Sequence, residues 1–179
     1  MGGRRIMLII PNLITLSRVA ATFALWLLFP SYPLTAFLLM LYAIASSTLD
    51  GFIARRPRCT NVFGAIIDPL ADKILYLGTL WLFREHLTVL VIFIAALPEL
   101  ILILIRLLAL AGIIYATIPA TTIGKYKMTF HCGILILLFL AHLVHSPLFW
   151  QSGTILVGFG FLLSCASVHS HFINRPTAQ

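Results

Sequence analysis

Three acidic side chains stand close together in a sequence that has few others. Asp50, Asp68 and Asp72 are three of the five acidic residues in a chain of 179 residues. Asp68 and Asp72 are four residues apart, a spacing that places both on one face of a helix. Carboxylate oxygens are the ligands that hard divalent cations prefer in proteins. The three aspartates are therefore candidate ligands of a divalent cation.

The stretches that carry these aspartates are apolar. Hydrophobic residues make up 61% of the chain and charged residues 9%, against about half and about a quarter in soluble domains. The apolar runs are long enough to span a bilayer as helices and lack the alternation of a β-barrel strand. We predict an all-α integral membrane protein, a single membrane domain of residues 1–179 with six transmembrane helices. The spans are expected at residues 12–30, 33–54, 62–83, 87–114, 126–144 and 152–172.

The basic residues predict how these helices are oriented. The net charge is +7, and Arg and Lys gather near residues 4–5, 55–58, 125–127 and 175, at alternate ends of the spans. By the positive-inside rule, both termini face the cytoplasm or the mitochondrial matrix. We expect a multi-pass protein of the bacterial or mitochondrial inner membrane, with basic residues that contact anionic lipids, not nucleic acid. One option for residues 1–18 is an interfacial segment whose Arg18 extends to the membrane surface.

The predicted topology brings the three carboxylates together. Asp50 ends the second span, while Asp68 and Asp72 lie near the start of the third. The loop between these spans is short, so we expect two adjacent antiparallel helices. An ionised aspartate deep in a membrane helix costs about 2.5–3.5 kcal/mol, so the cluster requires compensation. Either ion pairs with Arg55 and Lys73 supply it, or a divalent cation bound among the three carboxylates does.

Small residues flank the acids. Gly64 shares a helix face with Asp68 and Asp72, and Gly51 and Ala54 lie within one turn of the second-span aspartate. Glycine inside a helix costs about 1 kcal/mol relative to alanine. Packing between membrane helices also favours small residues. The small residues alone are therefore weak evidence. Together with the aspartates on the same helix faces, they indicate space for a bound ligand.

The complete pattern resembles the signature of a known family. It reads Asp50-Gly51-x-x-Ala54-Arg55, eight further residues, then Gly64-x-x-x-Asp68-x-x-x-Asp72. This spacing is similar, without a gap, to that of the CDP-alcohol phosphatidyltransferases, and the resemblance extends over nearly the whole chain. It implies a six-helix CDP-alcohol phosphotransferase-like bundle with a polar cavity open to the cytoplasmic side.

The resemblance also implies a role for each signature residue. Asp50, Asp68 and Asp72 would bind two divalent metals, Mg2+ or Mn2+, which hold the diphosphate of a CDP-linked lipid. Asp72 would act as the base on an acceptor hydroxyl, and CMP would leave. The remaining signature residues would bind the CDP-lipid: Gly51, Ala54, Arg55 and Gly64.

One position departs from the family pattern. The family has another aspartate three residues before the Asp-Gly pair, and Ser47 stands there instead. A neutral hydroxyl is a weaker ligand for a hard cation than a carboxylate. Two interpretations remain open. The enzyme works with one tightly bound metal and a second that arrives with substrate, or the chain keeps the fold with little or no activity.

Other stretches bear on the acceptor alcohol. Residues 11–18, 98–106 and 123–129 resemble segments of phosphatidylglycerophosphate synthases, which implies transfer from CDP-diacylglycerol to glycerol 3-phosphate. Arg106, Lys125 and Lys127 are candidate ligands of the acceptor phosphate. Alternatively, Arg106 pairs with Glu99, and the two lysines are topology signals or lipid contacts.

Two other functions stay open at this point. A cardiolipin synthase would use phosphatidylglycerol as the acceptor, and a non-catalytic membrane scaffold would release no CMP. Membrane lipids are expected partners and a homodimer is an option, but no stretch identifies a dimer interface. His86 and His131 have no predicted partner.

Overall fold

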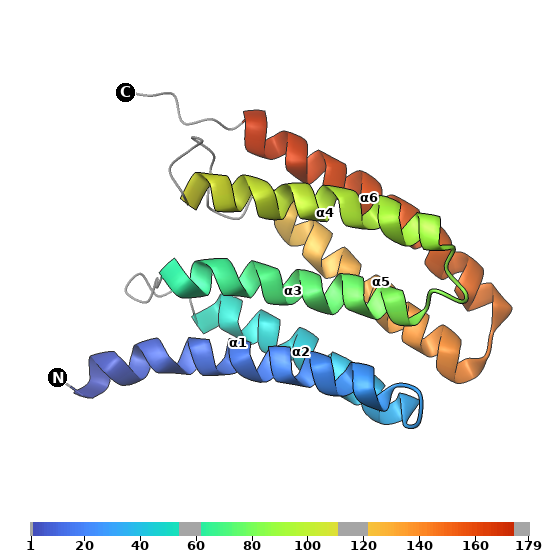
Figure 1. Ribbon diagram of the computed structural model, residues 1–179, viewed down its shortest axis with the longest axis horizontal. Coiled ribbons are helices and arrows are strands. Elements are labelled where there is room, and N and C mark those ends of the chain that lie inside the picture. The colour runs from blue at the N-terminus through green and yellow to red at the C-terminus, as the bar shows by residue number, and fades with distance from the viewer. Residues whose placement is uncertain (1, 54–61, 111–121, 174–179) are drawn as a thin grey trace. The chain divides into compact units, whose positions relative to one another are not determined.

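The computed structural model describes residues 2–53, 62–110 and 122–173, which form helices joined by short turns; side chains are described within 13–47, 70–109 and 123–170. Six helices follow one another along the chain (Figure 1). They coincide with the six apolar ranges of the sequence to within a few residues. The exception is α1, which begins at Gly2 and runs without a break through the stretch considered as an interfacial segment. The bounds are α1 Gly2–Leu28, α2 Pro33–Ile53, α3 Val62–Leu82, α4 Val89–Leu110, α5 Thr122–Val144 and α6 Pro147–Ile173.

Proline and one left-handed residue set several helix ends. Pro33 and Pro147 occupy the first positions of α2 and α6, where the missing N–H has no helical partner to lose. At the end of α5, His145 has a φ of 53°, and the N–H of Ser146 donates to the carbonyl of Ala141 at 3.3 Å. This is the hydrogen bond of a Schellman cap. The α5–α6 connection is therefore a defined two-residue turn.

Within the described residues, three helices are long and apolar enough to cross a membrane, over Val89–Ala109, Ile123–Val144 and Pro147–Ser170. Two shorter apolar segments lie at Leu13–Leu28 and Pro33–Ser47. Large apolar side chains remain exposed along the helices, such as Leu27 at 81% and Phe93 at 64%. Outward apolar side chains are what lipid contact requires. The protein is therefore an all-helical membrane protein, while the count of six spans stays a prediction.

The helices form two compact units, Met1–Leu82 and Phe83–Gln179. In the first unit, α1 packs against both α2 and α3, and these two touch each other only slightly. The predicted contact between α2 and α3 is present, as between Ser47 and Asp72, but α1 makes more contacts with each of these helices than they make with each other. In the second unit, α6 packs against both α4 and α5. The prediction of a single domain remains untested.

Glycine and aromatic residues fix the packing within each unit. A methyl group at Gly78 of α3 would collide with the indole of Trp26 of α1, so glycine allows the two helices to approach. In the second unit, the ring of Phe83 lies 5.2 Å from that of Phe139 and 5.4 Å from that of Trp150. Close approach through small residues is the usual basis of helix association in lipid.

Candidate functional site

Asp72 is held by two other helices of the first unit. Its Oδ1 accepts a hydrogen bond from Nη1 of Arg18 on α1, at 3.1 Å, and another from Oγ of Ser47 on α2, at 3.2 Å. The Asp72 side chain is 22% exposed. The carboxylate is therefore oriented by its neighbours and still accessible to a small molecule.

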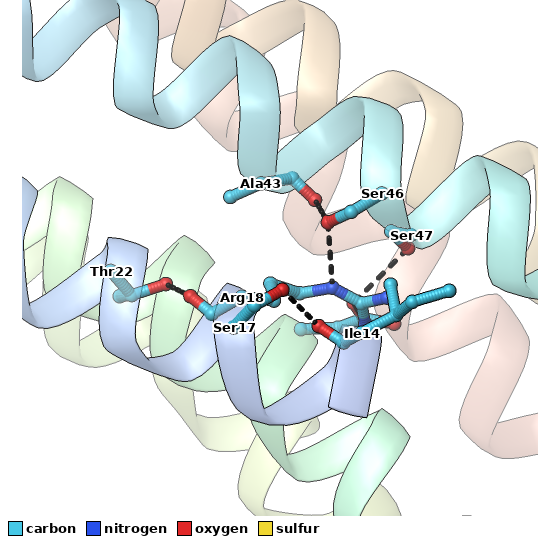
Figure 2. Close-up of polar contacts among 8 residues, drawn as sticks. Ile14, Ser17, Arg18, Thr22, Ala43, Ser46 and Ser47 are labelled. Carbon is cyan, nitrogen blue, oxygen red and sulfur yellow. Dashed lines mark hydrogen bonds and ion pairs between the residues drawn. The ribbon is translucent and has the colours of Figure 1, made fainter. Parts of the chain in front are cut away.

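Arg18 is buried, with 1% of its surface exposed. Its Nε donates to Oγ of Ser46 at 3.4 Å, and that hydroxyl donates to the carbonyl of Ala43 at 2.9 Å. Figure 2 shows the guanidinium of Arg18 directed toward Ser46 and Ser47. The expectation that Arg18 extends to the membrane surface is wrong. The carboxylate of Asp72 and the hydroxyl of Ser46 give the guanidinium polar partners inside the unit, which a lipid-facing rotamer would lack.

The sequence contains a signal for this burial. Thr15, Arg18, Thr22 and Leu25 follow one another at intervals of three, four and three residues, and all four are buried. That spacing marks one face of a helix. Two threonines and an arginine on an inward face indicate a polar contact within the bundle, and this face was not recognised from the sequence.

The other signature positions are only partly described. Asp50 and Gly51 lie in the last turn of α2, and Gly64 and Asp68 lie in the first two turns of α3. Their side chains are outside the described residues, as are Ala54 and Arg55 altogether. Among the side chains that are described, no group of three His, Cys, Asp or Glu residues could hold a metal ion. Asp72 is the one predicted ligand whose side chain is among those described.

A second polar cluster lies inside the other unit. Nζ of Lys127 on α5 donates to both carboxylate oxygens of Glu99 on α4, at 2.8 and 3.0 Å. Oγ of Ser164 on α6 donates to Oε1 of the same carboxylate at 2.7 Å. Nε2 of His131 lies 3.4 Å from that hydroxyl. All four residues are buried, so the cluster joins the three helices of this unit through polar atoms.

The predicted acceptor ligands differ in their surroundings. Lys127 is committed to Glu99, whereas Lys125 is exposed and Arg106 is half-buried on α4. His131, for which the sequence gave no partner, has Ser164 beside it. A histidine and a serine amid apolar helical sequence could have indicated such a cluster, because buried polar groups are nearly always hydrogen-bonded.

Comparison with known proteins identifies the family. The model of the CDP-alcohol phosphatidyltransferase family matches residues 8–165. That range includes the aspartates, Arg18 and both polar clusters. The chain belongs to the CDP-alcohol phosphatidyltransferase family.

Individual members of the CDP-alcohol phosphatidyltransferase family match part of the chain. One is the chloroplastic CDP-diacylglycerol–glycerol-3-phosphate 3-phosphatidyltransferase 1 of rice, 41% identical over 75 residues, which are 41% of this chain and 23% of the relative. Another is the enzyme of the same name from Pectobacterium atrosepticum, 41% identical over 81 residues, 43% of this chain and 44% of the relative. The Yersinia pestis enzyme is 38% identical over the same length. The matched part of the chain spans less than half the length of these relatives.

Proposed function

We propose that the chain transfers a phosphatidyl group from CDP-diacylglycerol to glycerol 3-phosphate and releases CMP. The observation that carries this proposal is the Asp72 carboxylate, held by Arg18 and Ser47 at the last acidic position of the signature. The names of the relatives, which specify these two substrates, support the choice of acceptor.

Asp72 has the properties that a general base needs. Arg18 and Ser47 orient its carboxylate, a group that can accept a proton. Its partial exposure lets an acceptor hydroxyl reach it. In the proposed reaction, Asp72 takes the hydroxyl proton as the acceptor oxygen bonds to the phosphorus of the phosphatidyl group. The bond from that phosphorus to the CMP oxygen breaks, and CMP leaves with the electron pair.

The acidic residues fit a divalent cation, Mg2+ or Mn2+. Asp72 presents oxygen ligands, and the neighbouring Ser47 adds a hydroxyl oxygen to the same region. Asp50 and Asp68 would complete the ligand set. Bound metal ions would stabilise the charge on the attacking and leaving oxygens. Because Ser47 is neutral, this set has one negative charge fewer than the family pattern.

The remaining signature residues would accommodate the CDP-lipid: Gly51, Ala54, Arg55 and Gly64. For the acceptor phosphate, the exposure of Lys125 makes it a better direct ligand than Lys127. Lys127, bound to Glu99, would instead contribute a fixed positive charge. Arg106 remains a candidate ligand from α4.

The proposed reaction takes place at a bacterial or mitochondrial inner membrane. The distribution of basic residues supports a cytoplasmic or matrix location for both termini, and the family resemblance supports a polar cavity open to that side. CDP-diacylglycerol would enter from the bilayer and glycerol 3-phosphate from the aqueous phase. Homodimer formation also remains a prediction.

The experiment is release of CMP by purified protein supplied with CDP-diacylglycerol and Mg2+ or Mn2+. We expect release with glycerol 3-phosphate, and loss of release by about 10²–10⁴-fold in Asp72→Asn, which removes a general base. Release only with phosphatidylglycerol would favour the cardiolipin synthase alternative. No release with any acceptor, from a folded protein, would favour the non-catalytic alternative that Ser47 suggests.

A further inference from the structure

Arg18 is a buried cation to which the proposed reaction assigns no chemical step. It lies on the inward face of α1, with its guanidinium bonded to Asp72 and Ser46. An arginine stays protonated in a protein, so its positive charge is a permanent part of this region. In a membrane protein, a buried charge of this kind is by default a candidate for a functional role.

The geometry at Asp72 shows what this charge does. Arg18 and Ser47 both donate to the same oxygen, Oδ1. Two donors from two different helices fix the orientation of the carboxylate. The guanidinium also supplies the positive charge that an aspartate among membrane helices requires. Ser47 contributes to this balance because its hydroxyl donates to Asp72, whereas an aspartate at the same position would repel it.

We infer that Arg18 is a built-in counter-cation, which pairs with the Asp72 carboxylate and orients it before a divalent ion and the substrates bind. The inference rests on the proposed function in treating Asp72 as a metal ligand. Arg18 is then a positioning residue, since it acts through Asp72. Its charge also repels an arriving cation. The arginine therefore stabilises the metal-free protein and weakens the binding of the ion.

Thermal unfolding of the full chain in detergent tests the first half of the inference. In EDTA, we expect Arg18→Gln to unfold about 5 °C or more below the wild type, because it leaves a carboxylate without its counter-charge. Arg18→Gln/Asp72→Asn, which removes both charges, should recover most of this loss. An excess of Mn2+ should stabilise Arg18→Gln more than the wild type, and should stabilise the double variant, which has lost one carboxylate ligand, less than Arg18→Gln.

Binding of Mn2+, measured by electron paramagnetic resonance, tests the second half. We expect Arg18→Gln to bind Mn2+ about tenfold more tightly than the wild type, because a repelling charge is gone. A merely structural arginine would not produce this change. Lys127→Gln is the matched control, since it also removes a buried cation from a carboxylate. Lys127→Gln should lower the unfolding temperature in EDTA, and added Mn2+ should not raise that temperature again.

Two results would overturn the inference. One is a double variant no more stable in EDTA than Arg18→Gln. The other is Mn2+ binding by Arg18→Gln that is equal to or weaker than that of the wild type. Failure of the wild type and Arg18→Gln alike to bind Mn2+ would contradict both this metal-linked role and the metal dependence of the proposed function. Normal Mn2+ binding without CMP release would contradict the proposed function alone.

Discussion

Lys127 of α5 forms an ion pair with Glu99 of α4 in which Nζ contacts both carboxylate oxygens, at 2.8 and 3.0 Å. Both side chains are buried, and Ser164 of α6 donates a third hydrogen bond to the same carboxylate. A buried pair of this kind is sensitive to the loss of one partner, because the other charge is left uncompensated. The packing of the second unit therefore depends on the positive charge of Lys127.

Loss of the Lys127 ammonium should destabilise the second unit. We expect Lys127→Met to reduce the free energy of unfolding by about 3–5 kcal/mol, since Glu99 would remain buried and charged. Glu99→Gln/Lys127→Met should regain most of that loss. Lys125→Met, at an exposed position two residues earlier, should change stability by less than about 0.5 kcal/mol. Chemical denaturation in detergent would measure all three, and equal effects of the two lysine variants would contradict the pairing.

The close approach of α1 and α3 at Gly78 should tolerate no added methyl group. Gly78→Ala places a Cβ against the indole of Trp26, and we expect a loss of about 1–3 kcal/mol from overpacking. Gly158→Ala is the matched control, because its Cβ would meet nothing within 4 Å among the described residues. Thermal unfolding should show a lower midpoint for the first variant and little change for the second. A neutral Gly78→Ala would mean that the two helices are farther apart.

Restoration of the family aspartate at position 47 should strengthen metal binding. Ser47→Asp adds a hard oxygen ligand beside Asp72, which Ser47 contacts at 3.2 Å. We expect tighter Mn2+ binding and faster CMP release at saturating substrate. In EDTA the same variant should be less stable than the wild type, because two carboxylates would then adjoin. A decrease in both Mn2+ affinity and turnover would place Ser47 outside the metal-binding region.

The two lysines that begin α5 should affect catalysis differently. Lys125 is exposed, so Lys125→Gln should raise the KM for glycerol 3-phosphate by about tenfold, the loss of one charge-assisted phosphate contact. Stability should be unchanged. Steady-state kinetics with CDP-diacylglycerol held saturating would make this measurement. An unaltered KM would instead identify Lys125 as a topology signal, as its position near the end of a span also allows.

The six helices could be predicted because apolar runs, proline positions and polar loops all identify the same ranges. The neighbours within each unit could not. α2 and α3 are joined by a short loop, and nothing local shows that each of them packs more extensively against α1 than against the other. Chain connectivity limits which helices are near one another, but side-chain packing decides which of them touch.

The site was predictable to the extent that its residues form one continuous motif. Asp72 was identified in this way, together with the unusual Ser47. Arg18 was not, because a single arginine near the end of an apolar run has the same appearance in the sequence as a topology signal. Its partner is 54 residues away. Glu99 and Lys127 likewise lie 28 residues apart. In the sequence, Glu99 suggests a partner for Arg106, and Lys127 suggests a phosphate ligand or a topology signal.

The hydroxyl of Ser164 has a consequence for biogenesis. Helices first insert into a bilayer one by one and only then associate, with interhelical hydrogen bonds among the forces that join them. α4 and α5 leave the ribosome before α6, yet both pack against α6, and Ser164 of α6 donates to the carboxylate of Glu99. We therefore expect the buried Glu99–Lys127 pair to reach its final surroundings only after the last helix has been inserted.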